Sequence, residues 1–97
     1  MAHLLPKFLV TFAKRIEVIM GANFRIDVTR QNRSILFKLH GDLNGSSACE
    51  VLRRMENYKG SALIILDFSR IRKCHPFGID ILKKGIRKEV IIKGFRS

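Results

Sequence analysis

The sequence predicts one α/β domain of 97 residues: a small mixed sheet of about four strands, helices packed on it, and an N-terminal amphipathic helix. Apolar residues before position 21 recur at three- and four-residue spacing, which is the helical period. Between positions 24 and 39 they alternate with polar residues, the period of a strand with one wet face. From position 47 onward helical and strand-like segments take turns, as in β–α–β units.

Residues 1–20 are predicted to be an amphipathic helical extension, and residues 21–97 the main domain. The apolar stripe consists of Leu5, Phe8, Leu9, Phe12, Ala13, Ile16, Ile19 and Met20. Because the opposite face is basic, the helix either packs on the core or lies on a membrane surface or a partner. A third interpretation is that the natural chain starts at Met20. No apolar run approaches the roughly 20 residues of a transmembrane helix, and we expect no signal peptide.

A hairpin and a first helix follow. Residues 24–29 and 34–39 predict two antiparallel strands, because Phe24, Ile26 and Val28 alternate with polar side chains. Residues 40–45 are predicted to be a glycine-containing loop. Ser47 and Glu50 have the spacing of a capping box at the start of a helix. The apolar stripe of this helix is Ala48, Val51, Leu52, Met55 and Tyr58.

Residues 62–68 predict a strand buried on both faces, because a continuous aliphatic run precedes Asp67. A basic loop, residues 70–73, comes next. A second helix is expected from Pro76 to about Lys84, since proline is tolerated at the first helical position. This helix is expected to bury Phe77, Ile81 and Leu82 and to end at Gly85. Residues 90–92 predict a last strand, and the connections should place the β–α–β strands parallel.

The formal net charge is +11, which favours attraction to polyanions. The excess lies after residue 69, where nine cations face two acids. Lys83, Lys84, Arg87 and Lys88 form a basic patch, which would bind a nucleic acid or an acidic protein if it shared a face with Arg70, Arg72 and Lys73. Aromatic residues for base stacking are scarce, so an acidic protein surface is the preferred partner and nucleic acid the alternative.

No chemistry-bearing constellation is found. Cys49 and Cys74 fit a reduced, cytoplasmic protein with free thiols. They and the histidines His3, His40 and His75 lack metal-ligand spacing, and no phosphate-binding loop is present. Cys74 adjoins His75, but sequence neighbours are not a catalytic pair, and a core thiol is the preferred interpretation. We therefore expect no catalytic residue, no metal and no cofactor, and hence no enzyme.

Three segments carry a family resemblance. They are residues 39–44 (LHGDLN), residues 63–69 (LIILDFS) and residues 74–82 (CHPFGIDIL). In this order and spacing, the region from Phe24 to Ile92 resembles a STAS domain, the fold of bacterial anti-sigma-factor antagonists. The resemblance implies a protein-binding role in bacterial signalling and transcription regulation.

In that family a serine at the helix start is phosphorylated by a partner kinase, and the added charge breaks the partner interface. Aligned through Gly78, the equivalent position here is Pro76, preceded by His75. Proline cannot accept a phosphate, so the resemblance implies a docking surface without the usual switch. This predicted surface comprises Asp42, Asn44, Arg70, Arg72, Lys73, His75, Pro76 and Phe77.

Three alternatives stay open at the residue level. His75 is either a pH-sensitive contact or a solvated helix cap. Phe77 is either a plug in the core or an exposed docking anchor. Ser46 and Ser47 are best explained as helix caps, with secondary phosphorylation as the other interpretation.

Overall fold

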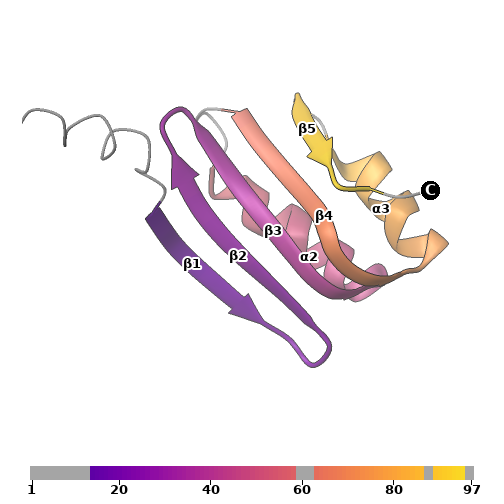
Figure 1. Ribbon diagram of the computed structural model, residues 1–97. Helices are drawn as coiled ribbons and strands as arrows, with labels where there is room; N and C mark the ends of the chain where they lie inside the picture. Colours follow the sequence, from indigo (N-terminus) through magenta and orange to yellow (C-terminus); the bar gives the residue numbers. More distant parts are fainter. Residues whose placement is uncertain (1–13, 59–62, 87–88, 96–97) are drawn as a thin grey trace, which may run out of the picture.

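The computed structural model describes residues 14–58, 63–86 and 89–95, which form one five-stranded sheet with helices on one side (Figure 1). The elements are β1 (Lys14–Met20), β2 (Phe24–Gln31), β3 (Ser34–Leu43), α2 (Gly45–Glu56), β4 (Leu63–Cys74), α3 (Pro76–Gly85) and β5 (Val90–Lys93). The sheet order is β1-β2-β3-β4-β5; the first three strands are antiparallel neighbours, and β3, β4 and β5 are parallel. The predicted mixed α/β fold is confirmed, with a fifth strand.

Both helices lie on the same face of the sheet (Figure 1). The parallel strands advance in one direction across the sheet, so crossovers of one hand return to one face. The core fills the space between this face and the helices. Its fully buried members are Ile26, Val28, Ile35, Phe37, Leu39, Leu43, Ala48, Val51, Ile64 and Leu66.

The opposite face of the sheet carries no helix from the described ranges. Ile65 lies on it and is partly exposed, whereas its neighbours Ile64 and Leu66 are fully buried. The expectation that this strand is buried on both faces is therefore wrong. The segment from Ile64 to Asp67 can expose one face because its backbone is already paired on both sides, by β3 and β5.

Charged side chains form a row across this open face. Asp27 lies opposite Lys38, Lys38 opposite Asp67, and Asp67 opposite Lys93. Opposite charges on facing strands contribute roughly 0.2–1 kcal/mol per pair. Burial raises the pKa of Asp67, but hydrogen bonds from Ser69 and the charges of Lys93 and Lys38 outweigh it and lower the pKa. Asp67 is thus a buried carboxylate held in its charged form.

The N-terminal helix prediction is wrong for Lys14–Met20, which form β1, and residues 1–13 lie outside the described residues. Ile16, Val18 and Met20 also satisfy the two-residue period of a strand, and β-branched residues favour strands. β2 offers this segment a complete antiparallel partner from Lys14 to Met20. The sheet therefore begins before the domain boundary expected at residue 21.

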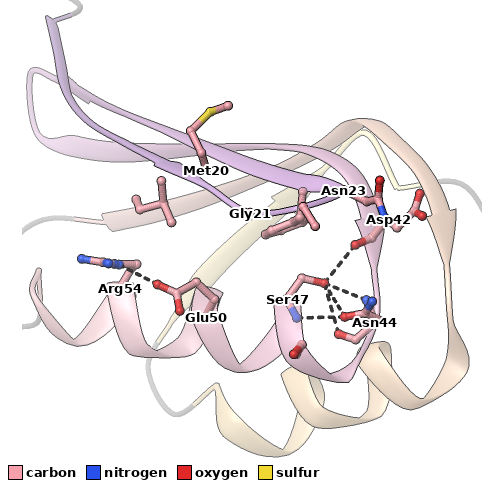
Figure 2. A pocket seen from close by; sticks show the side chains of 12 residues that line it. Met20, Gly21, Asn23, Asp42, Asn44, Ser47, Glu50 and Arg54 are labelled. Atoms are coloured by element: carbon pink, nitrogen blue, oxygen red, sulfur yellow. Dashed lines mark hydrogen bonds and ion pairs between the residues drawn. The ribbon is translucent and has the colours of Figure 1, made fainter.

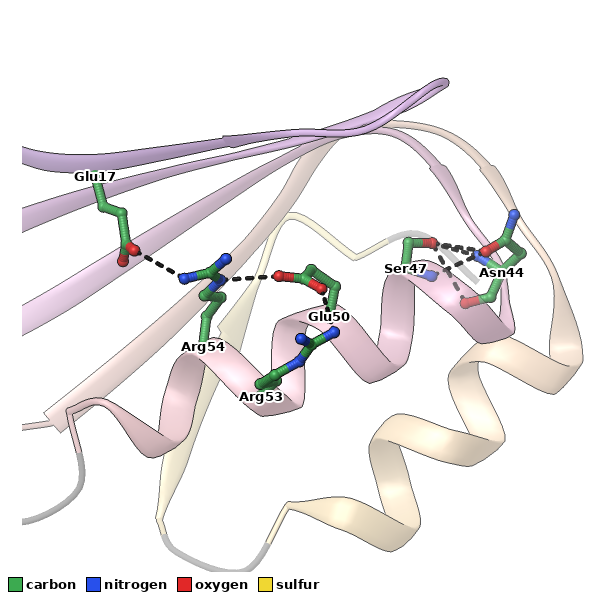
Figure 3. Close-up of polar contacts among 6 residues, drawn as sticks. All are labelled: Glu17, Asn44, Ser47, Glu50, Arg53 and Arg54. Carbon is green, nitrogen blue, oxygen red and sulfur yellow. Dashed lines mark hydrogen bonds and ion pairs between the residues drawn. The ribbon is translucent and has the colours of Figure 1, made fainter.

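A polar cluster ties β1 to α2. The Tyr58 hydroxyl donates a hydrogen bond to Glu17 Oε1 at 2.7 Å. Arg54 Nη1 lies 3.2 Å from Glu17 Oε2 (Figure 3). Burial and the neighbouring Glu17 raise the pKa of Tyr58 to about 12, so its hydroxyl stays protonated and donates. The edge strand is thereby fixed against the helix as well as against β2.

Two segments predicted as loops are strands. β3 continues through residues 40–43 and β4 through residues 70–74, because each supplies the backbone partner of the other as far as the pair Leu43 and Cys74. The predicted hairpin, the helix start at Pro76 and the last strand are confirmed.

The predicted capping box of Ser47 and Glu50 is wrong: Ser47 belongs to a capping box, but its partner is Asn44. Asn44 is the N-cap of α2: its Oδ1 accepts from the Ser47 backbone N–H at 3.0 Å, and its own N–H donates to Ser47 Oγ at 2.8 Å (Figure 3). Glu50 instead pairs with Arg53 and Arg54, each at 2.8 Å. Asn44 was overlooked as a cap because it was assigned to a loop.

Candidate functional site

β3 and β4 end side by side, and each leads directly into a helix. The carboxyl ends of neighbouring parallel strands are where open α/β sheets bring side chains together. The structure places seven of the eight predicted docking residues at this edge: Asp42, Asn44, Arg72, Lys73, His75, Pro76 and Phe77. Arg70 lies further back in β4, opposite His40.

The start of α3 is held against the junction of β3 and α2. The His75 backbone N–H donates to the Leu43 carbonyl at 2.9 Å. A Cβ on Gly78 would lie 2.9 Å from the Asn44 carbonyl carbon and oxygen and 3.0 Å from the Leu43 oxygen. These are backbone atoms that cannot swing aside, so only glycine permits this approach. The landmark glycine therefore fixes where α3 begins.

Phe77 is 67% exposed at this edge, so the expectation that α3 buries it is wrong. The buried residues of α3 are Gly78 and Leu82, and Phe77 is not among them. Its ring is packed beside Gly45, where an added Cβ would lie 3.0 Å from the ring carbons. Of the two alternatives for this residue, the structure has the exposed one.

Asp42 and Arg72 form an ion pair across β3 and β4. Arg72 Nη2 lies 3.1 Å and Nε 3.3 Å from Asp42 Oδ1, and the arginine side chain is 67% exposed. An exposed pair of this kind contributes little to stability, about 0–1 kcal/mol. Its effect is to hold the guanidinium at the edge beside α3. We call His75, Pro76 and Phe77, with Asn44 and the Asp42–Arg72 pair, the α3 tip surface.

A groove of about 490 Å³ lies next to this surface, between the β1–β2 turn and α2 (Figure 2). Met20, Gly21, Asn23 and Asp42 line the side of the sheet, and Asn44, Ser47, Glu50 and Arg54 line the other side (Figure 2). The turn is fixed because the Asn23 carbonyl accepts from the Asp42 N–H at 2.9 Å. Sequence reasoning missed this turn because residues 1–20 were assigned to a helix. The available signal was the alternation of Ile16, Val18 and Met20 before Gly21.

The described lysines of the predicted basic patch lie at the end of α3 that is remote from the basic end of β4. Lys83 and Lys84 occupy the last turn of α3, about 10–12 Å along the helix from Pro76. Lys84 pairs with Asp80 at 3.3 Å. Arg87 and Lys88 lie outside the described residues. Of the predicted patch, the structure thus describes two lysines at the C-terminal end of α3, whereas Arg72 and Lys73 lie just before its N-terminal end.

His40 lies on β3, opposite Arg70 of β4. Burial and the charge of Arg25 lower its pKa, and Asp27 opposes this shift only in part. His40 Nε2 lies 3.3 Å from Asp27 Oδ2 and 3.3 Å from Arg25 Nη2. The imidazole is therefore neutral at physiological pH and belongs to the polar network of the sheet.

Both cysteines are free and exposed, so the prediction that Cys74 is a core thiol is wrong. Partial burial nevertheless raises the pKa of the Cys74 thiol, which keeps it protonated and weakly nucleophilic. No three His, Cys, Asp or Glu side chains of the described ranges gather in a way that could hold a metal ion. None of the helices in those ranges is long and apolar enough to cross a membrane.

No family model matches the sequence, and no curated protein matches it. Among solved structures, the chain is similar to the crystal structure of an anti-sigma-factor antagonist, a STAS domain from Rhodobacter sphaeroides. The TM-score is 0.62 at 17% sequence identity, and the match covers 77% of this chain and 90% of that chain. The fold of this chain is therefore the STAS fold.

Proposed function

We propose that this chain is a non-catalytic interaction module that binds a protein partner through the α3 tip surface, as an anti-sigma-factor-antagonist-like regulator in the bacterial cytoplasm. The observation that carries the proposal is Phe77. A large aromatic side chain, 67% exposed and held beside Gly45, has the character of an interface anchor. Aromatic residues and arginine are enriched at protein interfaces, and Arg72 lies on the same surface.

The surface is preorganised, which supports a binding role. The contacts of Gly78 and His75 with the β3–α2 junction fix the first turn of α3. A rigid surface loses little conformational entropy on association. Binding through it therefore needs no rearrangement of the described elements.

Pro76 supports binding without the family's phosphorylation switch. It occupies the first position of α3, and its side chain has no hydroxyl group. His75, at the N-cap, makes no side-chain capping hydrogen bond. Pro76 cannot take the place of a phosphoserine, so we propose that occupancy of this surface is set by partner concentration.

Phe77→Asp tests the proposal. A charge in the centre of a desolvated interface should weaken partner binding at least about 30-fold, corresponding to 2 kcal/mol or more. The measurement is quantitative capture of partners from the native cytoplasm by wild type and variant, followed by a binding titration with the captured protein. Ile91→Asp is the matched control, because Ile91 is an apolar side chain, 47% exposed, on β5.

Equal binding by wild type and Phe77→Asp would place the interface elsewhere. The same titration repeated at several salt concentrations addresses the nucleic-acid alternative. Phosphate-dominated binding weakens steeply and log-linearly with salt, whereas an interface centred on Phe77 changes little.

A further inference from the structure

β4 extends well beyond β5. The two strands pair only from Ile64 to Asp67, whereas β4 runs on to Cys74 (Figure 1). On its other side β4 is paired with β3 as far as the pair Leu43 and Cys74. In the described part of the chain, the second half of β4 thus has a strand on one side only.

Gly94 and Phe95 follow β5 and do not continue its pairing with β4. Gly94 has a φ of +74° and lies against Ser69, where an added Cβ would be 2.7 Å from the Ser69 nitrogen. The Ser69 N–H is itself used by Asp67 Oδ1 at 2.9 Å. Phe95 then packs edge-on against Phe68, with ring centroids 5.3 Å apart. Residues 70–74, which we call the open edge, are left without a paired strand on this side within the described residues.

A cavity of about 320 Å³ lies beside the open edge. Phe68, Ile71 and Phe95 give it an apolar lining, and Ser69, Arg72 and Cys74 give it a polar one. A peptide that adds a strand to a sheet edge gains affinity from main-chain hydrogen bonds and specificity from pockets for alternate side chains. The open edge offers both features together.

The charge of the edge selects the peptide. Arg70, Arg72 and Lys73 lie within five residues and are exposed. Of these, only Arg72 has an acidic partner among the described residues, Asp42. Cations on an edge strand also serve to prevent unwanted pairing. Protection from pairing does not account for a cavity beside the edge that Phe68, Ile71 and Phe95 line in part, and the cavity therefore favours a binding role.

We propose that the open edge binds an extended segment of the partner protein as an added strand, with apolar side chains alternating with acidic ones. The inference rests on the proposed function and deepens it by naming the chemistry of the partner. The apolar side chain nearest the cavity enters it, and the acidic side chains face Arg70 and Lys73. The contacts are mostly with backbone atoms of β4, whereas the α3 tip surface acts through side chains.

The probe is a capped, fluorescent hexapeptide in which valine and glutamate alternate, titrated into the full chain. We expect saturable binding, with protection from hydrogen exchange confined to amides of residues 70–74 that face away from β3. N-methylation of alternate peptide nitrogens should weaken binding about ten-fold or more, because the added-strand hydrogen bonds are lost. Lys73→Glu should also weaken it, whereas Lys83→Glu, with the same change of charge on α3, should not.

Three outcomes would overturn the inference: no saturable binding, equal binding of the N-methylated peptide, or protection at another edge. Concentration-dependent protection of residues 70–74 without peptide would assign the edge to a second copy of this chain and also overturn it. Phe77→Asp should bind the peptide as wild type does. If this variant loses partner capture and still binds the peptide, the α3 tip surface has been separated from the open edge. Loss of peptide binding with intact partner capture would separate them as well.

Discussion

At the scale of single residues, Gly78 determines how α3 meets the sheet. In Gly78→Ala the new methyl group would press on the Asn44 and Leu43 backbone, at 2.9 and 3.0 Å. We expect a loss of roughly 1–3 kcal/mol in the free energy of unfolding, measured by urea titration. Gly21→Ala is the control, because the nearest atom to its Cβ would be 3.5 Å away. Equal stability of both variants would mean that α3 can shift without cost.

Asp67 predicts a pH dependence of stability. Its folded pKa lies below the ordinary value of 3.8, so its charged form stabilises the fold above that pH. This contribution is lost as the pH falls below 3.8 and through the folded pKa. Asp67→Asn should therefore cost roughly 1.5–3 kcal/mol at pH 7 and progressively less in strong acid, by denaturant titration across pH. Asp80→Asn is the control and should cost only about 0–1 kcal/mol at pH 7, because its ion pair with Lys84 is exposed.

At the scale of elements, the attachment of β1 is the feature most open to test. Tyr58→Phe removes the 2.7 Å hydrogen bond to Glu17 and leaves the ring contact with Phe37 in place. We expect a loss of about 1 kcal/mol in the free energy of unfolding. Relative to wild type, amide hydrogen exchange should accelerate more in β1 than in β3. Arg53→Ala removes only an exposed contact with Glu50 and serves as control. Unchanged exchange in β1 would show that pairing with β2 alone holds the strand.

The elements that could be predicted from sequence are those with a single consistent period. The hairpin, the aliphatic strand and the helix after Pro76 are of this kind. β1 satisfies both the helical and the strand period, and only the free edge of β2 decides between them. The extensions of β3 and β4 depend on their mutual pairing, which no local pattern contains.

The sequence allowed us to predict where the candidate site lies in the fold, but not which of its side chains are exposed. The loop and helix-start landmarks correctly brought Asp42, Asn44 and residues 72–77 to one edge. The exposure of Phe77 and Cys74 was not predictable, because apolar and thiol side chains are usually buried. The open edge was invisible in the sequence, since it arises from the difference in length between β4 and β5.

At the scale of the whole molecule, the net charge of +11 predicts a salt effect on stability. Added salt screens repulsion among like charges over distances of about 10 Å and more. The melting temperature should therefore rise between low salt and a few hundred millimolar sodium chloride. A variant with Arg70, Lys73 and Lys83 all changed to glutamine should show a smaller rise. A melting temperature that falls with salt would mean that the ion pairs outweigh the repulsion.

The row of alternating charges on the bare side of the sheet has a consequence for solubility. A β-sheet face that no described helix covers would ordinarily associate with the same face of a second molecule and exclude water between them. Here that contact would strip hydration from Asp27, Lys38 and Lys93 together, at a cost of several kcal/mol per ion before any new attraction is counted. The row of ions is therefore expected to oppose face-to-face association, so that the sheet face which no described helix covers can stay in contact with water.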